Sequence, residues 1–145
     1  MEQYHELEHT ADVGLKVYGE TIEELFINGV KGLFHLISPG LKVACSQDVF
    51  PHGLPKNIIE LESSTQEELL VHWLGEFIYI FFVKKLYPKN VKFENLTENN
   101  LRAEVEFNKY NKDLPINLEI KAATYHNLSI KSVDNIYQAD VIFDV

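Results

Sequence analysis

The stretch TQEELLVHWLGEFIYIFFVKKL, residues 65–86, decides the fold class of this chain. Thr65 followed by Glu68 is a capping-box pattern, in which side chains satisfy the free N–H groups at a helix start. Apolar residues then recur at steps of three and four, which predicts a helix that runs to about Leu86 and stops at Tyr87-Pro88. The apolar residues cover more than one face, which is typical of a helix at the centre of a core. A partner-binding face is the alternative.

A second helix is predicted nearer the N-terminus. Thr21 and Glu24 repeat the capping pattern, and an apolar stripe at helical spacing follows until Pro39. Gly29 and Gly32 lie within this stripe and lower its helix propensity. A glycine in a helix also permits close packing, so we expect this helix to lie on a sheet.

The remaining segments alternate apolar and polar residues with the period of half-buried strands. The predicted strands cover Val13–Val17, Leu41–Cys45, Ile59–Leu61, Leu101–Phe107, Ile116–Ile120 and Ala139–Val145. Asn99-Asn100 and Tyr110–Asp113 are predicted hairpin turns. This order predicts one α+β domain over residues 1–145, with two helices packed on a mainly antiparallel sheet.

The composition excludes several classes of protein. The chain has 145 residues, of which 46% are hydrophobic, so general disorder is excluded. Its 22 acidic and 13 basic residues give a formal charge of −9. This balance argues against autonomous nucleic-acid binding, because phosphate contacts need clustered lysine and arginine. It is compatible with a cation site or with docking on a basic protein.

Cys45 is the only cysteine in the sequence, which excludes an internal disulfide and a cysteine-based zinc cluster. We expect a buried structural thiol. The N-terminal residues lack a basic region followed by an apolar run, so no signal peptide is predicted. The longest uncharged apolar run, Phe77–Val83, has seven residues and is too short for a bilayer. We therefore expect a soluble, cytoplasmic protein that does not contact membranes.

Three segments carry residues suited to chemistry, although the sequence has no glycine-rich phosphate loop, GxSxG or HExxH motif. They are the turn His9–Asp12, the segment Lys121–His126 and the end Phe143–Val145. Asp144 and a carboxylate on Val145 would supply two oxygen donors of the kind that Ca²⁺, Mg²⁺ and Mn²⁺ prefer. Asp12 would add a third if the last strand pairs near the first. Alternatively, Asp12 closes a turn and Asp144 is solvated.

His9 and His126 are candidate ligands or acid–base groups, and hydrogen-bonded structural roles are the alternative. Lys121 is a candidate for balancing the charge of an acidic site or for meeting a phosphate. Four further histidines show no evident partner in the sequence: His5, His35, His52 and His72.

The same three segments carry a family resemblance. HTADVG at residues 9–14, KAATYHNL at 121–128 and FDV at 143–145 are together similar to the signatures of the archease family. The resemblance extends over essentially the whole chain. It implies a small α+β protein that is an accessory factor, not an enzyme, for the RtcB-type RNA ligase of tRNA splicing and RNA repair. Members speed formation of the ligase–guanylate intermediate and allow multiple turnover.

The resemblance also implies a divalent-metal site formed by Asp12, Asp144 and Val145, with calcium as the expected ion. The implied partner is the ligase, and RNA is reached only through it. Two other functions stay open. One is a stand-alone metal-dependent phosphoesterase with His9 or His126 as its base, and the other is a chaperone-like binding module. Residues 41–62 show no family motif.

Overall fold

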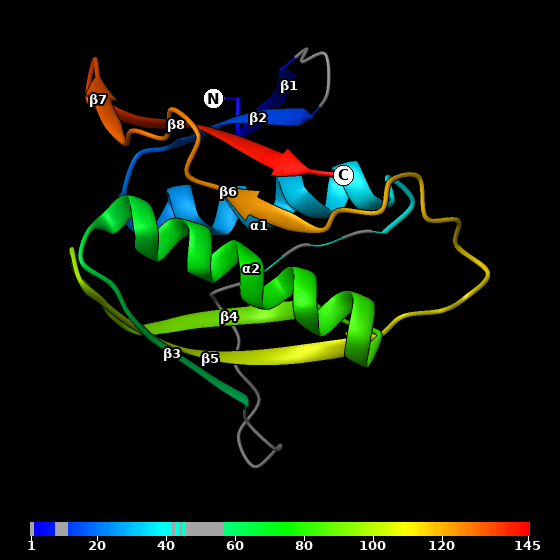
Figure 1. The fold of residues 1–145 in the computed structure, drawn as a ribbon. Helices are drawn as coiled ribbons and strands as arrows, with labels where there is room; N and C mark the ends of the chain where they lie inside the picture. The colour runs from blue at the N-terminus through cyan, green and yellow to red at the C-terminus, as the bar shows by residue number, and fades with distance from the viewer. Residues whose placement is uncertain (1, 8–11, 42, 44, 46–56) are drawn as a thin grey trace.

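Two helices lie between two antiparallel sheets in the computed structural model of this chain (Figure 1). The structure describes residues 2–7, 12–41, 43, 45 and 57–145. The predicted α+β class is confirmed, with two sheets where one was expected. The elements in chain order are β1 (Tyr4–Leu7), β2 (Val13–Gly19), α1 (Ile22–Ile37), β3 (Asn57–Glu62), α2 (Gln66–Lys84), β4 (Leu86–Leu96), β5 (Asn100–Lys109), β6 (Ala122–Thr124), β7 (Lys131–Val133) and β8 (Ile136–Asp144).

Both predicted helix starts are confirmed by their caps. The Thr21 hydroxyl accepts a hydrogen bond from the Glu24 N–H at 3.0 Å, and Thr65 accepts one from the Glu68 N–H at 3.1 Å. These bonds satisfy N–H groups that have no partner within the helix. α2 ends at Lys84, two residues before the predicted limit, because Lys85 adopts the left-handed conformation (φ 59°). β4 then begins at Leu86.

The position of α2 explains why it is apolar on more than one face. It contacts β6 of the larger sheet on one side and β3 and β4 of the smaller sheet on the other. Trp73 is fully buried, and its indole N–H donates to the Phe26 carbonyl of α1 at 3.1 Å. A helix between two sheets must present apolar side chains to both. The predicted central helix is therefore confirmed.

The close approach expected from the glycines of α1 is also present. A Cβ on Gly32 would lie 2.4 Å from Leu15 Cδ2 and 3.0 Å from Tyr4 Cγ, so α1 packs directly on β1 and β2 there. Gly29 faces the other helix, where a Cβ would lie 3.4 Å from Leu74 Cδ2. Only Gly32 is required by the packing, because 3.4 Å is an ordinary contact distance.

The two sheets take their strands from different parts of the chain. The five-stranded sheet has the order β1-β2-β8-β6, with β7 also paired to β8. The three-stranded sheet has the order β3-β5-β4. In Figure 1 the five-stranded sheet lies above the helices and contains the first and last strands of the chain, while the three-stranded sheet lies below.

Two predicted strands are wrong. Leu41, Val43 and Cys45 lie outside strands, and residues 42 and 44 lie outside the described residues. Ile116–Ile120 is irregular: the N–H groups of Asn117 and Leu118 donate to the Ile37 carbonyl at the end of α1, at 2.7 and 3.2 Å. Leu41, Cys45 and Ile120 nevertheless reach the core, so these apolar residues are buried without lying in a strand.

The sequence reasoning missed β4, because Pro88 was interpreted only as a helix stop. β4 is an edge strand, and its register with β5 shifts between Pro88 and Asn90. Proline is tolerated at such positions because its missing N–H faces away from the ladder or lies at a bulge. The short strands β1, β6 and β7 were also not predicted as such.

The predicted burial of Cys45 is confirmed, since only 3% of the residue is exposed. Burial raises the pKa of the thiol to about 12, and the nearby Lys31 opposes this only in part. Among the described residues, no helix is both long and apolar enough to cross a membrane.

Candidate functional site

The pairing of β2 with β8 brings two of the three chemically interesting segments together. Val13 pairs with Phe143 in an antiparallel register, so Asp12 and Asp144 are the next residues along these neighbouring strands. The condition on which the sequence argument depended, that the last strand pairs near the first, is confirmed. Asp12 and Asp144 are separated by 132 positions in the chain, and only the sheet makes them neighbours.

The third segment joins the same end of the sheet through β6. Ala122 pairs with Asp144, and the Lys121 N–H donates to the Asp144 carbonyl at 2.9 Å. Lys121 is exposed and lies next to the end of β8, where Val145 follows. The backbone of Lys121 is therefore placed beside Asp144, and the role of its side chain as a cation near an acidic site stays a prediction.

The alternation of β2 and β8 places the two aspartates on the outer face of the sheet. Leu15, Val141 and Phe143 are fully buried toward the helices. Asp12 and Asp144 lie one residue away from these inward positions, at even numbers where the buried residues have odd ones, so they lie on the other face of the sheet. Asp12 is half-buried, whereas Asp144 is exposed and Val145 is 41% exposed.

Gly14 allows the strands to approach closely beside Asp12. A Cβ at this position would lie 2.8 Å from Leu7 Cβ and 3.1 Å from Ile142 Cδ1. The first distance is shorter than real side-chain contacts, so the outer face admits only a glycine between β1 and β8. This gives a physical reason for the glycine in the HTADVG segment.

The donor set fits a hard cation in kind. Within the described part of the chain, no three histidine, cysteine, aspartate or glutamate side chains lie together as a metal cluster. A cation site at this end of the sheet would combine oxygens of Asp12, Asp144 and Val145. All three groups supply oxygen, which is what calcium and magnesium prefer over nitrogen or sulfur.

The two histidine candidates have different outcomes. His9 lies outside the described residues. His126 is exposed and lies beyond the end of β6 that is farther from Asp144. Its backbone N–H donates to Thr124 Oγ1 at 3.4 Å. β6 runs antiparallel to β8, so moving from Ala122 toward His126 leads away from the aspartates. The structure does not bring His126 to the candidate metal site.

Sequence reasoning missed the partners of His72, as it did those of His5. His72 on α2 is within hydrogen-bond distance of Ser63 Oγ (2.8 Å from Nδ1) and Tyr125 Oη (3.0 Å from Nε2). This chain of contacts fastens the TYH segment to the start of α2. The sequence showed no sign of a partner for His72, because no sequence pattern indicates a contact with a residue 53 positions away.

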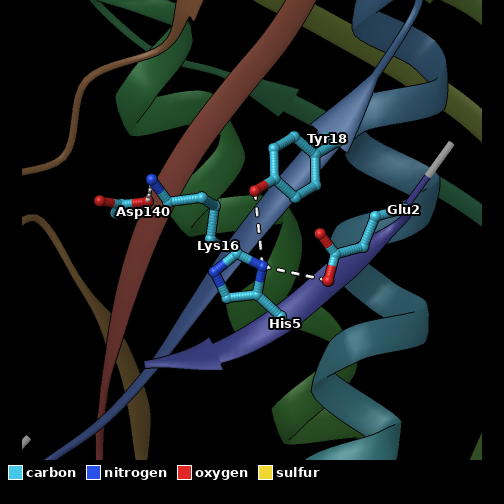
Figure 2. A network of polar contacts seen from close by, with 5 residues as sticks. All are labelled: Glu2, His5, Lys16, Tyr18 and Asp140. Atoms are coloured by element: carbon cyan, nitrogen blue, oxygen red, sulfur yellow. Dashed lines mark hydrogen bonds and ion pairs between the residues drawn. The ribbon is translucent and has the colours of Figure 1, made fainter. Parts of the chain in front are cut away.

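Figure 2 shows a second polar network on the outer face of the five-stranded sheet. His5 Nδ1 lies 3.2 Å from Glu2 Oε1 and 3.4 Å from Tyr18 Oη, and Lys16 pairs with Asp140 across β2 and β8 at 3.6 Å. Lys16 is four residues from Asp12, about 13 Å along an extended strand. The outer face therefore carries polar groups along β2 and β8 from Asp12 to Tyr18.

Comparison with known proteins places these features in a family context. Residues 4–145 match the family model described as the Archease protein family (MTH1598/TM1083). "Protein archease" of Methanosarcina barkeri is 34% identical over 148 residues, covering 99% of this chain and 96% of that protein. The corresponding protein of Methanosarcina mazei is 32% identical with the same coverage.

Two solved structures share the fold. The solution structure of Methanobacterium thermoautotrophicum protein 1598 has a TM-score of 0.75 and 24% identity, with 100% of both chains covered. A crystal structure from Thermotoga maritima, described as an archease and possible chaperone, has a TM-score of 0.61 and 19% identity. It covers 96% of this chain and 94% of that one.

Proposed function

Because this chain belongs to the archease family, we propose that it is a non-catalytic activator of an RtcB-type RNA ligase in tRNA splicing and RNA repair. The activator promotes guanylylation of the ligase and its multiple turnover. The observation that carries the proposal is the β2–β8 register, which gathers Asp12 and Asp144 beside Val145 at one end of the five-stranded sheet.

These oxygen donors are the groups that would hold a divalent ion, with calcium as the expected one. When bound, the ion supplies positive charge that a nucleotide phosphate or a ligase carboxylate can meet. The chain's own residues orient the site. Phe143 anchors β8 in the core, the backbone bond from Lys121 to Asp144 fixes its end, and Gly14 lets β1 approach closely.

The charge of the chain supports action through a protein partner. A formal charge of −9 disfavours strong binding to RNA phosphates. An acidic end that docks at the ligase therefore reaches RNA indirectly, while the ligase carries out the chemistry. This is why the proposal assigns no catalytic residue to the chain.

A ligation time course tests the proposal. It uses cognate ligase, excess RNA substrate, GTP and a divalent metal, with no addition, with wild-type protein, or with Asp144→Ala. We expect wild-type protein to raise product per ligase and Asp144→Ala to lose this effect. Asp140→Ala is the matched control, because Asp140 is exposed on the same face of β8 but lies four residues away.

Three outcomes would contradict the proposal. The first is the absence of any acceleration by wild-type protein at any ratio to ligase. The second is an Asp144→Ala variant that melts far below wild type by circular dichroism, which would make Asp144 structural. Release of phosphate from an ester by the protein alone, over many turnovers, would instead indicate the stand-alone phosphoesterase.

The metal site is tested separately by calorimetric titration with calcium. Removing one of three oxygen ligands in Asp144→Ala should weaken binding by about tenfold or more. One residue added after Val145 should weaken it as well, because the addition moves the carboxylate. Unchanged affinity in that extended protein would show that the carboxylate of Val145 is not a ligand.

A client-binding role is the second candidate. The Thermotoga maritima protein of the same fold is described as a possible chaperone, and this chain exposes apolar side chains beside α2. Suppression of aggregation of clients unrelated to RNA ligation, retained in Asp144→Ala, would favour this role over ligase activation.

A further inference from the structure

Large apolar side chains are exposed on both β3 and α2. Ile58 on β3 is 41% exposed, and Tyr79 and Val83 on α2 are 49% and 62% exposed. Tyr79 and Val83 are four residues apart and therefore neighbours on one helix face. Ile58 and Tyr79 also line one groove, so exposed apolar residues from two elements border the same hollow, which is a mark of an interaction surface.

A groove of about 170 Å³ lies between these two elements. Ile58 and Ile59 line it from β3, and Tyr79 and Ile80 line it from α2. Phe107 of β5 and Leu86 extend its apolar lining, while Glu76 and Lys84 provide charged groups. The groove lies beside the first three residues of β3, Asn57 to Ile59, and has room for an apolar side chain of an extended segment laid along that strand.

β3 offers a free edge beside this groove. It pairs with β5 on one side, and no strand within the described residues pairs with its other side. An edge strand presents backbone N–H and C=O groups ready for another strand. A helix next to a free sheet edge is the arrangement that domains binding peptides by strand addition use.

The side chains of β3 indicate which residue types an added strand would need. Ile59 and Leu61 point into the core, whereas Ile58, Glu60 and Glu62 have the outward phase and are exposed. An added strand alternates in the same way. Its inward side chains would meet Tyr79 and the groove, which favours apolar residues. Its outward side chains would lie beside Glu60 and Glu62, which favours basic residues.

The neighbouring charges leave this edge acidic. Arg102 on β5 contacts Glu60 Oε2 at 2.5 Å and Glu94 Oε2 at 2.6 Å, so one guanidinium serves two carboxylates. Glu62 adds a further negative charge on the same face. A second copy of this chain fits the edge poorly. Antiparallel pairing of two β3 strands centred on Glu60 would place two carboxylates opposite each other, and like charges there are destabilising.

We propose that the free edge of β3 and the groove beside α2 bind an extended segment of a partner protein in which apolar and basic residues alternate. The segment adds a fourth strand to the three-stranded sheet. The inference does not depend on ligase activation, because the aspartates of the candidate metal site lie on the other sheet.

The test uses two capped eight-residue peptides as probes, one alternating valine and lysine and the other alternating valine and glutamate. Each is titrated into isotope-labelled full-length protein while backbone amide signals are recorded. We expect the lysine peptide to shift the amides of Ile58–Glu62 and the glutamate peptide to bind at least about tenfold more weakly. Binding of both peptides with equal affinity, or shifts confined to the five-stranded sheet, would overturn the proposal.

Protein variants test the two parts of the surface. Tyr79→Ser and Glu62→Lys should each weaken the lysine peptide by about tenfold, because one removes an apolar anchor and the other reverses a rim charge. Val133→Ser is the matched control, since Val133 is 45% exposed and lies on the other sheet. All changed residues are exposed, and circular dichroism checks that each variant is folded. Equal binding by all variants would overturn the proposal.

Backbone methylation of the peptide separates strand addition from simple apolar contact. In a strand, the N–H groups of alternate residues point to the same side. Methylating the set that faces β3 should abolish binding, and methylating the other set should leave it within about twofold. Equal tolerance of both sets would show that β3 contributes no backbone pairing and would overturn the proposal.

Discussion

The two sheets pack on the same pair of helices, but their free surfaces have different chemistry. The outer face of the five-stranded sheet carries aspartates at one end and a network of paired polar groups along β2 and β8. The three-stranded sheet presents an acidic edge next to exposed apolar side chains of α2. The first arrangement suits an ion and the second suits a peptide strand, so a change to one surface should leave the other working.

The two sheets also differ in how the chain builds them. The candidate metal site exists only where β2 pairs with β8, strands from opposite parts of the chain. The free edge of β3 lies in a sheet whose strands all come from residues 57–109. Pairing over a long sequence separation couples the metal site to complete folding, because the chain entropy lost in closing so long a loop is offset only by the contacts of the folded core. The predictions below test this division.

The largest effect is expected from truncating the core below the metal site. Phe143 is fully buried and directly precedes Asp144, so Phe143→Ala should lower the free energy of unfolding by about 3–5 kcal/mol in urea. Val105→Ala, at a fully buried position of β5, should cost about 2 kcal/mol. Under conditions where both variants stay folded, only Phe143→Ala should weaken calcium binding. Equal weakening in Val105→Ala would show that the two sheets are not independent.

Two glycine substitutions should change stability in opposite directions. Gly14→Ala places a Cβ 2.8 Å from Leu7 Cβ, so it should destabilise the protein by about 1–3 kcal/mol and weaken calcium binding. Gly29→Ala places a Cβ 3.4 Å from Leu74 Cδ2, a normal contact. It should stabilise α1 by up to about 1 kcal/mol through helix propensity. Thermal melts check both signs, and stabilisation by Gly14→Ala would contradict the close approach of β1 and β8.

Alkaline pH should destabilise the folded protein through the buried thiol of Cys45, which lies in the connection from α1 to the three-stranded sheet. Its folded pKa is raised from 9.0 to about 12, so the folded state keeps a proton that the unfolded chain loses. The thiol's contribution is therefore complete below pH 9 and is lost as pH rises toward 12, by about 1.4 kcal/mol per pH unit in that window.

The measurement is the difference in unfolding free energy between wild type and Cys45→Ala as a function of pH. Comparison with the variant cancels the titration of tyrosines and lysines that both proteins share. The advantage of wild type should shrink above pH 9. A difference that does not change up to pH 11 would mean that the thiol is not protected from ionisation by burial.

The smallest effect is expected from Arg102. Arg102→Gln leaves Glu60 and Glu94 without their shared cation and makes the β3 edge more acidic. The valine–lysine peptide should then bind about two- to threefold more tightly, with a steeper dependence on salt, as expected for an exposed charge. Lys16→Gln, which breaks an exposed pair on the other sheet, should not change this affinity. A weaker peptide complex in Arg102→Gln would contradict the acidic edge as the source of specificity.

Local patterns predicted the local structure well. Thr21 and Thr65 begin helices because their hydroxyls accept hydrogen bonds from N–H groups of the first turn, which have no partner within the helix. This depends only on neighbouring residues. The clean alternation of Leu101–Phe107 predicted β5. The same alternation failed at Ile116–Ile120, where the backbone bonds to the end of α1. Apolar residues at every second position indicate that one side of the segment contacts a core, and they do not require that the segment pair with another strand.

The sequence alone predicted which residues could hold a cation, since Asp12 and Asp144 stand out by type and by their similarity to family segments. It also determined that α2 would lie in the core. Only the tertiary structure decided that β2 pairs with β8, that His126 lies away from the aspartates, and that no strand of the described residues covers the edge of β3 beside Tyr79. The physical reason is range: caps and periodicity are set by residues within a turn or two, whereas strand order is set by which apolar faces the whole chain can bury together.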